Sequence, residues 1–248
     1  MKNQKLFFSK RKLEPEEMGA EENTIFEKVA RDKYKIWFQF LVDHIIEETN
    51  TKKGEILDVA CGPGFLSKEL AGRSSKFDVE GMDVSSQMIL QARKNCAGLK
   101  NTNFRVGSVY KLPYATNSFD LVVCRDSFHH FAKPKPALAE MIRVLKPGAH
   151  LYIQDLRRDL PFYLLKQALP RENIFQKLQY YSTRAAFTRF EIIELLKKNV
   201  DVSFTIKTRK LNRMLLDKCK MKGIEVAELR ANFQAHYILV LRKKYDFF

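Results

Sequence analysis

Small and acidic residues follow two apolar runs of this sequence, at positions where a chain can hold a polar ligand. In the stretch EILDVACGPGF, residues 55–65, the apolar Ile56, Leu57 and Val59 precede Gly62 and Gly64. Glycine permits a sharp turn and a close approach of the backbone to a bound group. The later run FDVEGMDV, residues 77–84, ends in an acid at position 83, and a carboxylate there can accept both hydroxyls of a ribose. This pattern favours a ligand that contains adenosine.

The glycine turn differs from two common nucleotide-binding loops. Ser67 stands where the third glycine of G-x-G-x-x-G should fall, so close helix packing for a pyrophosphate is not specified. No G-K-[ST] follows the turn, which excludes a P-loop. The turn therefore suits a ligand that is smaller and less anionic than a dinucleotide.

His129 and His130 are candidate general bases. They follow a third apolar run, FDLVVCRD at 119–126, and so fall at the end of a sheet where ligands bind. An imidazole with a pKa near neutrality suits proton removal from a phenol or a carbon acid. The alternative is structural: a histidine bonded to the backbone in a loop that shapes the pocket. The sequence leaves both interpretations open.

The elements that must position these residues alternate regularly along the chain. Strands are predicted at 55–60, 77–84, 103–109, 119–126 and 150–156, and helices at 65–73, 85–98 and 137–145. KPGA, residues 146–149, is predicted as a turn. Ser85 or Ser86 is the expected cap of the second helix. Strands that alternate with helices of this length predict βαβ units, with a parallel sheet covered on both faces. A further amphipathic helix capped by Thr188 and two more strands, 201–208 and 236–244, complete the α/β pattern.

The composition is that of a globular domain with a sizeable core. Of 248 residues, 45% are hydrophobic and 12% aromatic, and no apolar run approaches the roughly 18 residues of a membrane span. The N-terminal stretch contains only LFF as an apolar piece, too short for a signal peptide. The cysteines lack metal-ligand spacing, so no metal site is expected, and they indicate free thiols in a reducing cytoplasm: Cys61, Cys96, Cys124 and Cys219.

The formal net charge of +15 is the unusual bulk feature. Such a charge suits a nucleic acid, an acidic substrate or an anionic membrane surface. The basic residues are spread along the chain, which favours a general enrichment in lysine with no partner. The densest segment, residues 206–230, contains eight Lys and Arg against three acids.

Four blocks of this sequence resemble the class I methyltransferases that depend on S-adenosylmethionine (SAM), in the type 11 branch similar to ubiquinone and menaquinone methyltransferases. The blocks are EILDVACGPGF, VEGMDVSSQMI, NFRVGSVYKLPYATNSFDLVVCRDSFHHF and EMIRVLKPGAHLYIQD, in order within about residues 50–157. STRAAFTRFEIIELLKKN is similar to a later helix of the family. The resemblance implies a Rossmann-like sheet of seven mostly parallel strands, the last antiparallel, with helices on both faces. It also implies SAM as cofactor, with S-adenosylhomocysteine as product.

The resemblance assigns residues to the parts of SAM. The methionine part of SAM would be surrounded by Asp58, Ala60, Gly62 and Gly64, and its amino group would donate to the backbone near Arg125. The ribose hydroxyls would be held by Asp83. The adenine would be flanked by Val84 and Met88 and would meet Ser108 and Val109 at its edge. Two positions depart from the family pattern, which often has glycine at 60 and aspartate at 108. The neutral Ser108 hydroxyl would hold the adenine amine less strongly than a carboxylate.

The expected organisation is a mobile arm at 1–22 and a single methyltransferase domain at 23–248. Within the domain we expect a helical cap at 23–49, a SAM-binding core at 50–157 and a helical acceptor-side insertion at 158–187. A C-terminal helix and strands would follow at 188–248, with the basic insertion at 206–230. The cap and the acceptor-side insertion are the least regular parts, and they are rich in Phe, Tyr and Leu.

The predicted activity is methyl transfer from SAM to a small hydrophobic or aromatic acceptor, since apolar side chains line such pockets. No Asn/Asp-Pro-Pro-Tyr follows residue 124, which argues against methylation of an exocyclic base amine. Two alternatives stand beside it. The charge suits an RNA or ribosomal-protein methyltransferase, and a non-catalytic SAM-binding protein would carry the same cofactor motifs.

Overall fold

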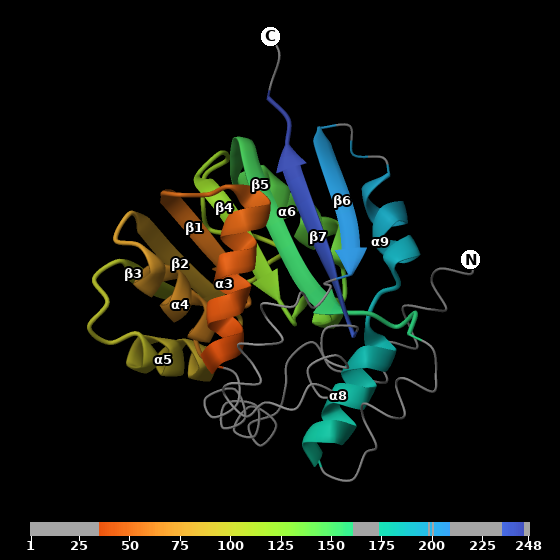
Figure 1. The fold of residues 1–248 in the computed structure, drawn as a ribbon, viewed down its shortest axis with the longest axis horizontal. Helices are drawn as coiled ribbons and strands as arrows, with labels where there is room; N and C mark the ends of the chain where they lie inside the picture. Colours follow the sequence, from red (N-terminus) through yellow and green to blue (C-terminus); the bar gives the residue numbers. More distant parts are fainter. Residues whose placement is uncertain (1–34, 161–173, 198, 200, 209–234, 246–248) are drawn as a thin grey trace.

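A single mixed sheet organises the molecule (Figure 1). The computed structural model describes residues 35–160, 174–197, 199, 201–208 and 235–245. Five strands run parallel: β1 (Gly54–Val59), β2 (Phe77–Asp83), β3 (Thr102–Val106), β4 (Phe119–Arg125) and β5 (Leu145–Leu156). β7 (His236–Lys243) lies antiparallel between β5 and β6 (Val202–Thr208), in the order β3-β2-β1-β4-β5-β7-β6. The predicted seven-stranded fold with an antiparallel last strand is confirmed.

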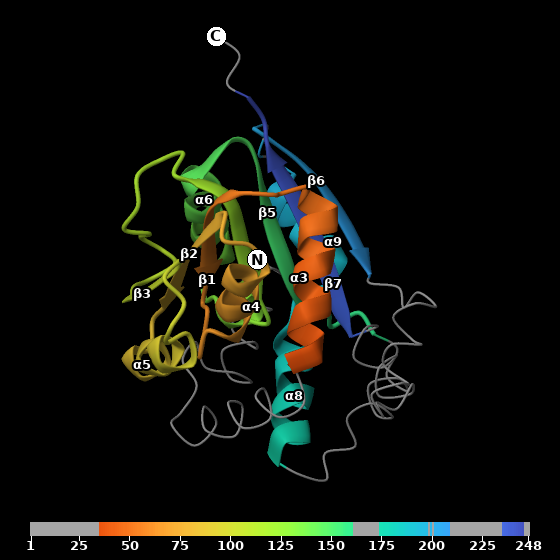
Figure 2. The ribbon, with the colours of Figure 1, turned by 60° about the vertical axis from the view of Figure 1, so that its left-hand side comes forward.

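Helices cover both faces of the sheet (Figure 2). On one face lie α3 (Lys35–Thr49) and α4 (Phe65–Arg73), and on the other lie α6 (Pro134–Val144) and α9 (Arg189–Leu196). α5 (Ser86–Asn95) packs near β2 and β3, and the short 3-10 helix η1 (Phe128–His130) follows β4. α8 (Ile174–Ala185) contacts η1 beyond the end of the sheet.

The central strands are buried on both faces, which explains their continuous apolar runs. Ile56 of β1 and Leu121 of β4 are fully buried in the cluster beneath α3 and α4. Their neighbours Leu57 and Val122 point to the opposite cluster, which Met141 of α6 joins. The alternation of side chains between the faces thus fixes the register, and with it the level at which each strand ends.

The structure confirms two predicted caps and moves several boundaries. The Ser85 hydroxyl accepts the N–H of Met88, and Thr188 forms a capping box with Glu191. The KPGA segment, predicted as a turn, belongs to β5, where the pairing with β4 shifts register between Phe119 and Leu121. An irregularity of this kind bends a strand without ending it. β3 ends at Val106, earlier than the predicted 109.

Several sequence predictions fall outside the described residues. These are the arm at 1–22, the start of the cap, part of the acceptor-side insertion, Cys219 and most of the basic insertion. Cys61, Cys96 and Cys124 are buried free thiols. Among the helices that the structure describes, none is long and apolar enough to cross a membrane. A search of the described ranges finds no cluster of His, Cys, Asp and Glu suited to a metal ion.

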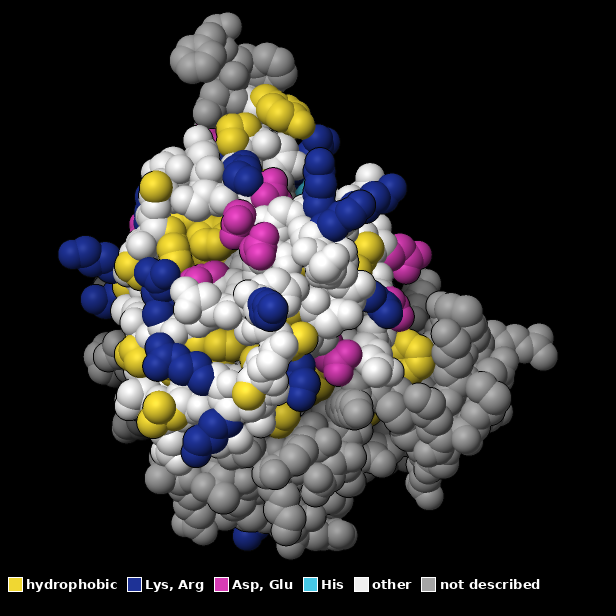
Figure 3. Space-filling model, turned by 90° about the vertical axis from the view of Figure 1, so that its left-hand side faces the viewer, with side chains coloured by type: hydrophobic (Ala, Val, Ile, Leu, Met, Phe, Trp, Pro, Cys, Tyr) yellow, Lys and Arg dark blue, Asp and Glu magenta, His cyan; other side chains and the backbone are white. Residues whose placement is uncertain are grey.

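The charged side chains are spread over the described part of one face. Figure 3 shows Lys and Arg scattered there, interrupted by Asp, Glu and apolar side chains. Several cations are paired with acids, as in Arg73 with Asp43, Lys146 with Asp120 and Arg143 with Glu140. The described part of this face thus carries dispersed rather than concentrated positive charge.

Candidate functional site

The candidate site lies at the edge where the parallel strands end. β1 has β2 on one side and β4 on the other, so the connections after these strands diverge beside β1. In open α/β sheets such a switch point leaves a crevice outside the carboxyl ends of the strands, and ligands bind there. The loops after β1, β2, β3, β4 and β5 all reach this edge.

The loop after β1 presents its backbone to open space. Ala60, Gly62 and Gly64 all have positive φ, at 56°, 52° and 76°. A Cβ on Gly64 would lie 2.9 Å from the Cβ of Ala92, so this glycine allows α5 to pack against the loop. A Cβ on Gly62 would meet no atom within 4 Å. Gly64 is therefore required for packing against α5, whereas Gly62 leaves room for a bound group.

Asp83 is held against this loop by the backbone. One carboxylate oxygen accepts the N–H of Gly62 at 2.9 Å, and the other accepts the N–H of Ser85 at 2.9 Å. The side chain at the end of β2 is thereby fixed beside the turn after β1. A carboxylate oriented in this way suits recognition of vicinal hydroxyls.

Asp58 supports the loop from beneath. Its side chain is buried, and the Ser67 hydroxyl donates to it at 2.6 Å. Burial raises the pKa of the Asp58 carboxyl to about 7, against the opposing effect of the Ser67 hydrogen bond. Ser67, at the position of the missing third glycine, therefore ties α4 to β1. Its hydroxyl explains why this position is not glycine.

The residues predicted around adenine surround the start of α5 and the loop after β3. Val84 is 53% exposed and Met88 is buried. Ser108 is exposed, its hydroxyl accepts the N–H of Tyr110 at 3.3 Å, and Val109 is buried. Because Val106 pairs with Asp83, the loop after β3 begins level with the end of β2. The structure thus brings these predicted residues to one edge of the sheet.

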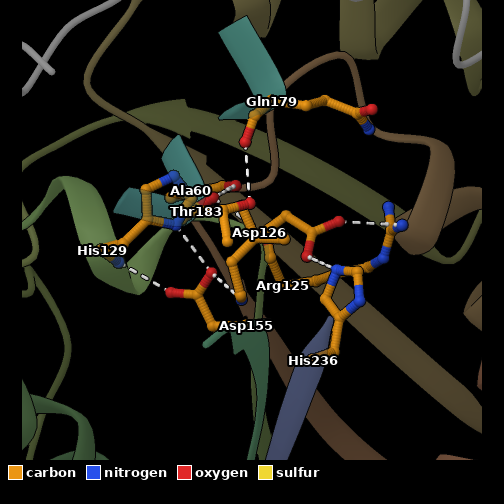
Figure 4. Close-up of polar contacts among 10 residues, drawn as sticks. Ala60, Arg125, Asp126, His129, Asp155, Gln179, Thr183 and His236 are labelled. Carbon is orange, nitrogen blue, oxygen red and sulfur yellow. Dashed lines mark hydrogen bonds and ion pairs between the residues drawn. The ribbon is translucent and has the colours of Figure 1, made fainter. Parts of the chain in front are cut away.

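The end of β4 carries a partly buried ionic cluster (Figure 4). Asp126 has a positive φ of 49°, and its carboxylate lies 2.9 Å from the Arg125 guanidinium and 3.0 Å from Nε2 of His236. Burial opposes ionisation, but Arg125 and His236 hold the pKa of Asp126 well below its usual range. The guanidinium also stacks 4.7 Å from the ring centroid of Phe38, which links β4 to α3. The Arg125 carbonyl accepts the Ser127 hydroxyl at 2.9 Å.

The two candidate bases differ in their surroundings. Nδ1 of His129 lies 2.6 Å from one carboxylate oxygen of Asp155, and the His129 backbone N–H donates to the other at 2.7 Å. Both side chains are almost fully buried. His130 is more exposed, and its ring lies 4.2 Å from that of His129. Sequence reasoning did not select Asp155, although an acid that ends the apolar run LYIQD was a usable signal.

Fold and site together define a nucleotide-binding α/β protein of the methyltransferase type. A family model described as a methyltransferase domain matches residues 50–218, more than half of the chain. The chain belongs to this family, which confirms the class that the four sequence blocks predicted. The match begins where the predicted core begins and continues beyond residue 157.

Individual relatives agree on the class and differ in their named substrates. The chain is 41% identical over 102 residues to a demethylmenaquinone methyltransferase of Deinococcus radiodurans, covering 40% of this chain and 42% of that protein. It is 36% identical over 104 residues to a malonyl-[acyl-carrier protein] O-methyltransferase of Legionella pneumophila, covering 42% and 37%. The chain thus matches less than half the length of either relative.

Solved structures of the same fold cover nearly the whole chain. The plantazolicin methyltransferase BpumL, in complex with S-adenosylhomocysteine (SAH), superposes with a TM-score of 0.74 over 98% of each chain at 18% identity. At that identity the likeness shows the fold alone. The described residues therefore have the class I methyltransferase fold.

Proposed function

We propose that this protein transfers a methyl group from SAM to a small apolar or aromatic acceptor. The observation that carries the proposal is the pairing of Gly62 with Asp83. A left-handed glycine with open space at its Cα is bonded to a carboxylate at the end of the next strand. This arrangement fits the close backbone approach and the ribose recognition that SAM requires.

The other predicted residues take roles around this pair, within one domain at 23–248. Asp58, Ala60 and Gly64 shape the loop at the methionine part, Val84, Met88, Ser108 and Val109 surround adenine, and the Arg125 carbonyl accepts from the amino group. Exposure of Val84 beside Asp83 supports an apolar face for the base. The Ser127 bond to the Arg125 carbonyl supports a fixed acceptor at the end of β4.

The protein's chemical task is alignment. SAM supplies a methyl group on a positively charged sulfur, which leaves with the bonding electron pair and needs no acid. The chain orients the acceptor in line and excludes water from the site. Only the acceptor's proton requires a catalytic side chain.

The composition of the predicted cap and acceptor-side insertion supports an apolar acceptor, because both segments are rich in Phe, Tyr and Leu. Phe128 of η1 and Phe187 pack with ring centroids 5.3 Å apart, but both are buried in the core and support η1 from within. The relative named for demethylmenaquinone acts on a quinone, which is an apolar acceptor.

Calorimetry with SAM tests the binding half of the proposal. Asp83→Asn removes the charge that strengthens bonds to the ribose, so the affinity for SAM should fall about 10–100-fold. Asp78→Asn, exposed on the same strand, serves as the matched control and should bind like the wild type. Equal affinities for all three proteins, or no binding at all, would contradict the proposal.

Methyl transfer is tested with labelled SAM and fractionated cell extract. Label in the organic-soluble fraction is the expected result. Label in RNA or in protein would favour the RNA or ribosomal-protein alternative. Tight SAM binding with no label in any fraction would point to a non-catalytic binding protein.

A further inference from the structure

A buried histidine and a buried carboxylate face each other through two hydrogen bonds at the acceptor end of the site. Nδ1 of His129 lies 2.6 Å from Oδ1 of Asp155, and the backbone N–H of the same histidine donates to Oδ2 at 2.7 Å. The His129 side chain is 2% exposed and that of Asp155 is 0% exposed. The carboxylate therefore binds both the backbone and the ring of one residue, which fixes where the imidazole lies and how it is turned.

The carboxylate also selects one form of the ring. A carboxylate is only an acceptor, so the neutral imidazole must carry its proton on Nδ1 to form this bond. Nε2 then has the basic lone pair, and it points away from Asp155. Figure 4 shows the ring with Nδ1 turned toward Asp155, in the cluster that includes Ala60 from the loop after β1 and Thr183 from α8.

Neighbouring contacts connect this ring with the proposed SAM site. Ser127, which begins the turn into η1, places its hydroxyl 3.4 Å from the carbonyl of Ala60 and 2.9 Å from that of Arg125. η1 therefore lies against the loop after β1, while α8 contacts it from the other direction. His129 thus belongs to an element that touches both the proposed cofactor loop and α8 on the proposed acceptor side.

We propose that His129 is the general base toward the acceptor and that Asp155 is its positioning residue. This inference rests on the proposed methyl transfer. Of the two adjacent histidines we select His129, because the buried Asp155 carboxylate orients its ring. A purely structural link between η1 and β5 needs only the backbone bond to Oδ2, whereas the bond to Nδ1 adds control of the ring.

The proton step balances within these residues. Nε2 of His129 takes the proton from an acceptor O–H, and the oxygen keeps the electron pair that forms its bond to the methyl carbon. The resulting imidazolium is stabilised by the Asp155 carboxylate. The imidazolium then returns its proton to water, which restores the neutral ring with the proton on Nδ1.

A spectroscopic test reads the tautomer without any acceptor. The chain has five histidines, so ¹⁵N-histidine labelling gives few imidazole signals, and His129→Gln assigns the signal of interest. The expected result is a His129 ring protonated on Nδ1 in the wild type. In Asp155→Asn the proton should redistribute to Nε2, because the amide can donate to Nδ1. A wild-type ring protonated on Nε2 would overturn the proposal.

A kinetic test uses a prenylated naphthoquinol as the methyl acceptor. In the plot of kcat against pH, the wild-type value should fall on the acidic side as His129 is protonated; we call this fall the acidic limb. His129→Gln should remove the acidic limb and lower kcat by about 10²–10⁴-fold. Asp155→Asn should lower kcat roughly 10²-fold and move the acidic limb to lower pH, since loss of a nearby anion lowers the pKa of an imidazole.

Other ionisable groups near the His129 ring could also affect how kcat depends on pH. Among the described residues these include Asp155 of β5, Asp126 at the end of β4 and His130 in η1. His150→Gln, at the opposite end of β5, is the matched control and should keep the wild-type profile. If His130→Gln removes the acidic limb and His129→Gln does not, the proposal is wrong. The KM for SAM separates the proposed methyl transfer from the proposed roles of His129 and Asp155. A wild-type protein that does not bind SAM would contradict the proposed function, whereas a normal KM for SAM with an unchanged pH profile in His129→Gln would contradict the role of His129.

Discussion

At the scale of single residues, Gly62 offers the clearest test of the proposed SAM cradle. Alanine at position 62 would place a methyl group in open space, with a φ of 52° that costs about 1 kcal/mol for a residue with a Cβ. The variant should therefore fold. Its affinity for SAM should fall at least about tenfold, because the methyl group occupies the space left for close backbone approach.

Gly72→Ala is the matched control for this substitution. Gly72 lies in α4 and likewise has no atom within 4 Å of a built Cβ, but its φ is not positive. Alanine there should raise the unfolding free energy by up to about 1 kcal/mol and leave SAM binding unchanged. Calorimetry and urea unfolding measure the two effects. An unaltered SAM affinity in Gly62→Ala would contradict the cradle.

The buried Asp58 should make stability depend on pH. Its pKa is raised by burial to about 7 in the folded protein and is near 4 in the unfolded chain. Between pH 4 and pH 7 the Asp58 carboxyl is therefore protonated in the folded protein and ionised in the unfolded chain. Because the folded state binds more protons, the unfolding free energy falls as pH rises through this range. The loss attributable to Asp58 should be about 2–4 kcal/mol.

Asp58→Asn tests this expectation. The amide oxygen can still accept from Ser67, and the side chain no longer ionises. The difference in unfolding free energy between wild type and variant should shift in favour of the variant between pH 5 and pH 8. Urea titrations at several pH values measure it, with the exposed Asp78→Asn as control. A difference that stays constant with pH would show that Asp58 does not titrate in this window.

At the scale of elements, the sequence predicted what periodicity and caps determine. The seven strands, the order of helices, and the caps Ser85 and Thr188 all followed from local patterns. The KPGA segment did not, because Pro and Gly signal a turn locally, whereas β5 continues through it between the pairs Leu145–Phe119 and His150–Leu121 with β4. Tertiary contacts overrode local preference there.

Local sequence patterns predicted single residues of the candidate site but not the contacts between residues that are distant in sequence. Gly62 and Asp83 were found because each follows an apolar run and matches a family block. The bond between Ser67 and Asp58 and the pairing of Asp155 with His129 join residues whose proximity depends on the fold. No local pattern specifies such contacts, and so the sequence could not choose between His129 and His130.

The capping box of α9 should contribute measurably to stability. The Thr188 hydroxyl accepts the N–H of Glu191 at 3.1 Å, and the Glu191 carboxylate accepts the N–H of Thr188 at 2.8 Å. This helix buries Ile192 and Leu196 against the sheet. Thr188→Ala should lower the unfolding free energy by about 1 kcal/mol.

Urea unfolding measures the loss of this cap. Ser86→Ala, at the exposed first residue of α5, is the control and should change stability by less than about 0.5 kcal/mol. SAM affinity should be unchanged in Thr188→Ala, since Thr188 lies outside the proposed cofactor site. A cap variant as stable as the control would show that α9 is held by packing alone.

At the scale of the whole molecule, the charge of +15 bears on partners rather than on chemistry. On the face drawn in Figure 3 the described positive side chains are dispersed. Several cations are paired with acids, as in Arg143 with Glu140 and Lys146 with Asp120. A dispersed charge attracts polyanions weakly and without sequence preference. A dedicated RNA enzyme would instead need contacts that hold one strand in register at the reaction centre.

The expected behaviour with RNA is therefore weak binding that salt removes. Binding to mixed RNA that rests on six to ten phosphate contacts should weaken about 10³–10⁵-fold between 50 and 200 mM salt. Filter binding over this range measures the slope, and labelled SAM in the same mixture measures transfer. We expect affinity at low salt, little at 200 mM, and no label in RNA. Binding that persists at 200 mM together with methylated RNA would replace the small-molecule proposal, because transfer to RNA requires a specific complex that charge alone does not provide.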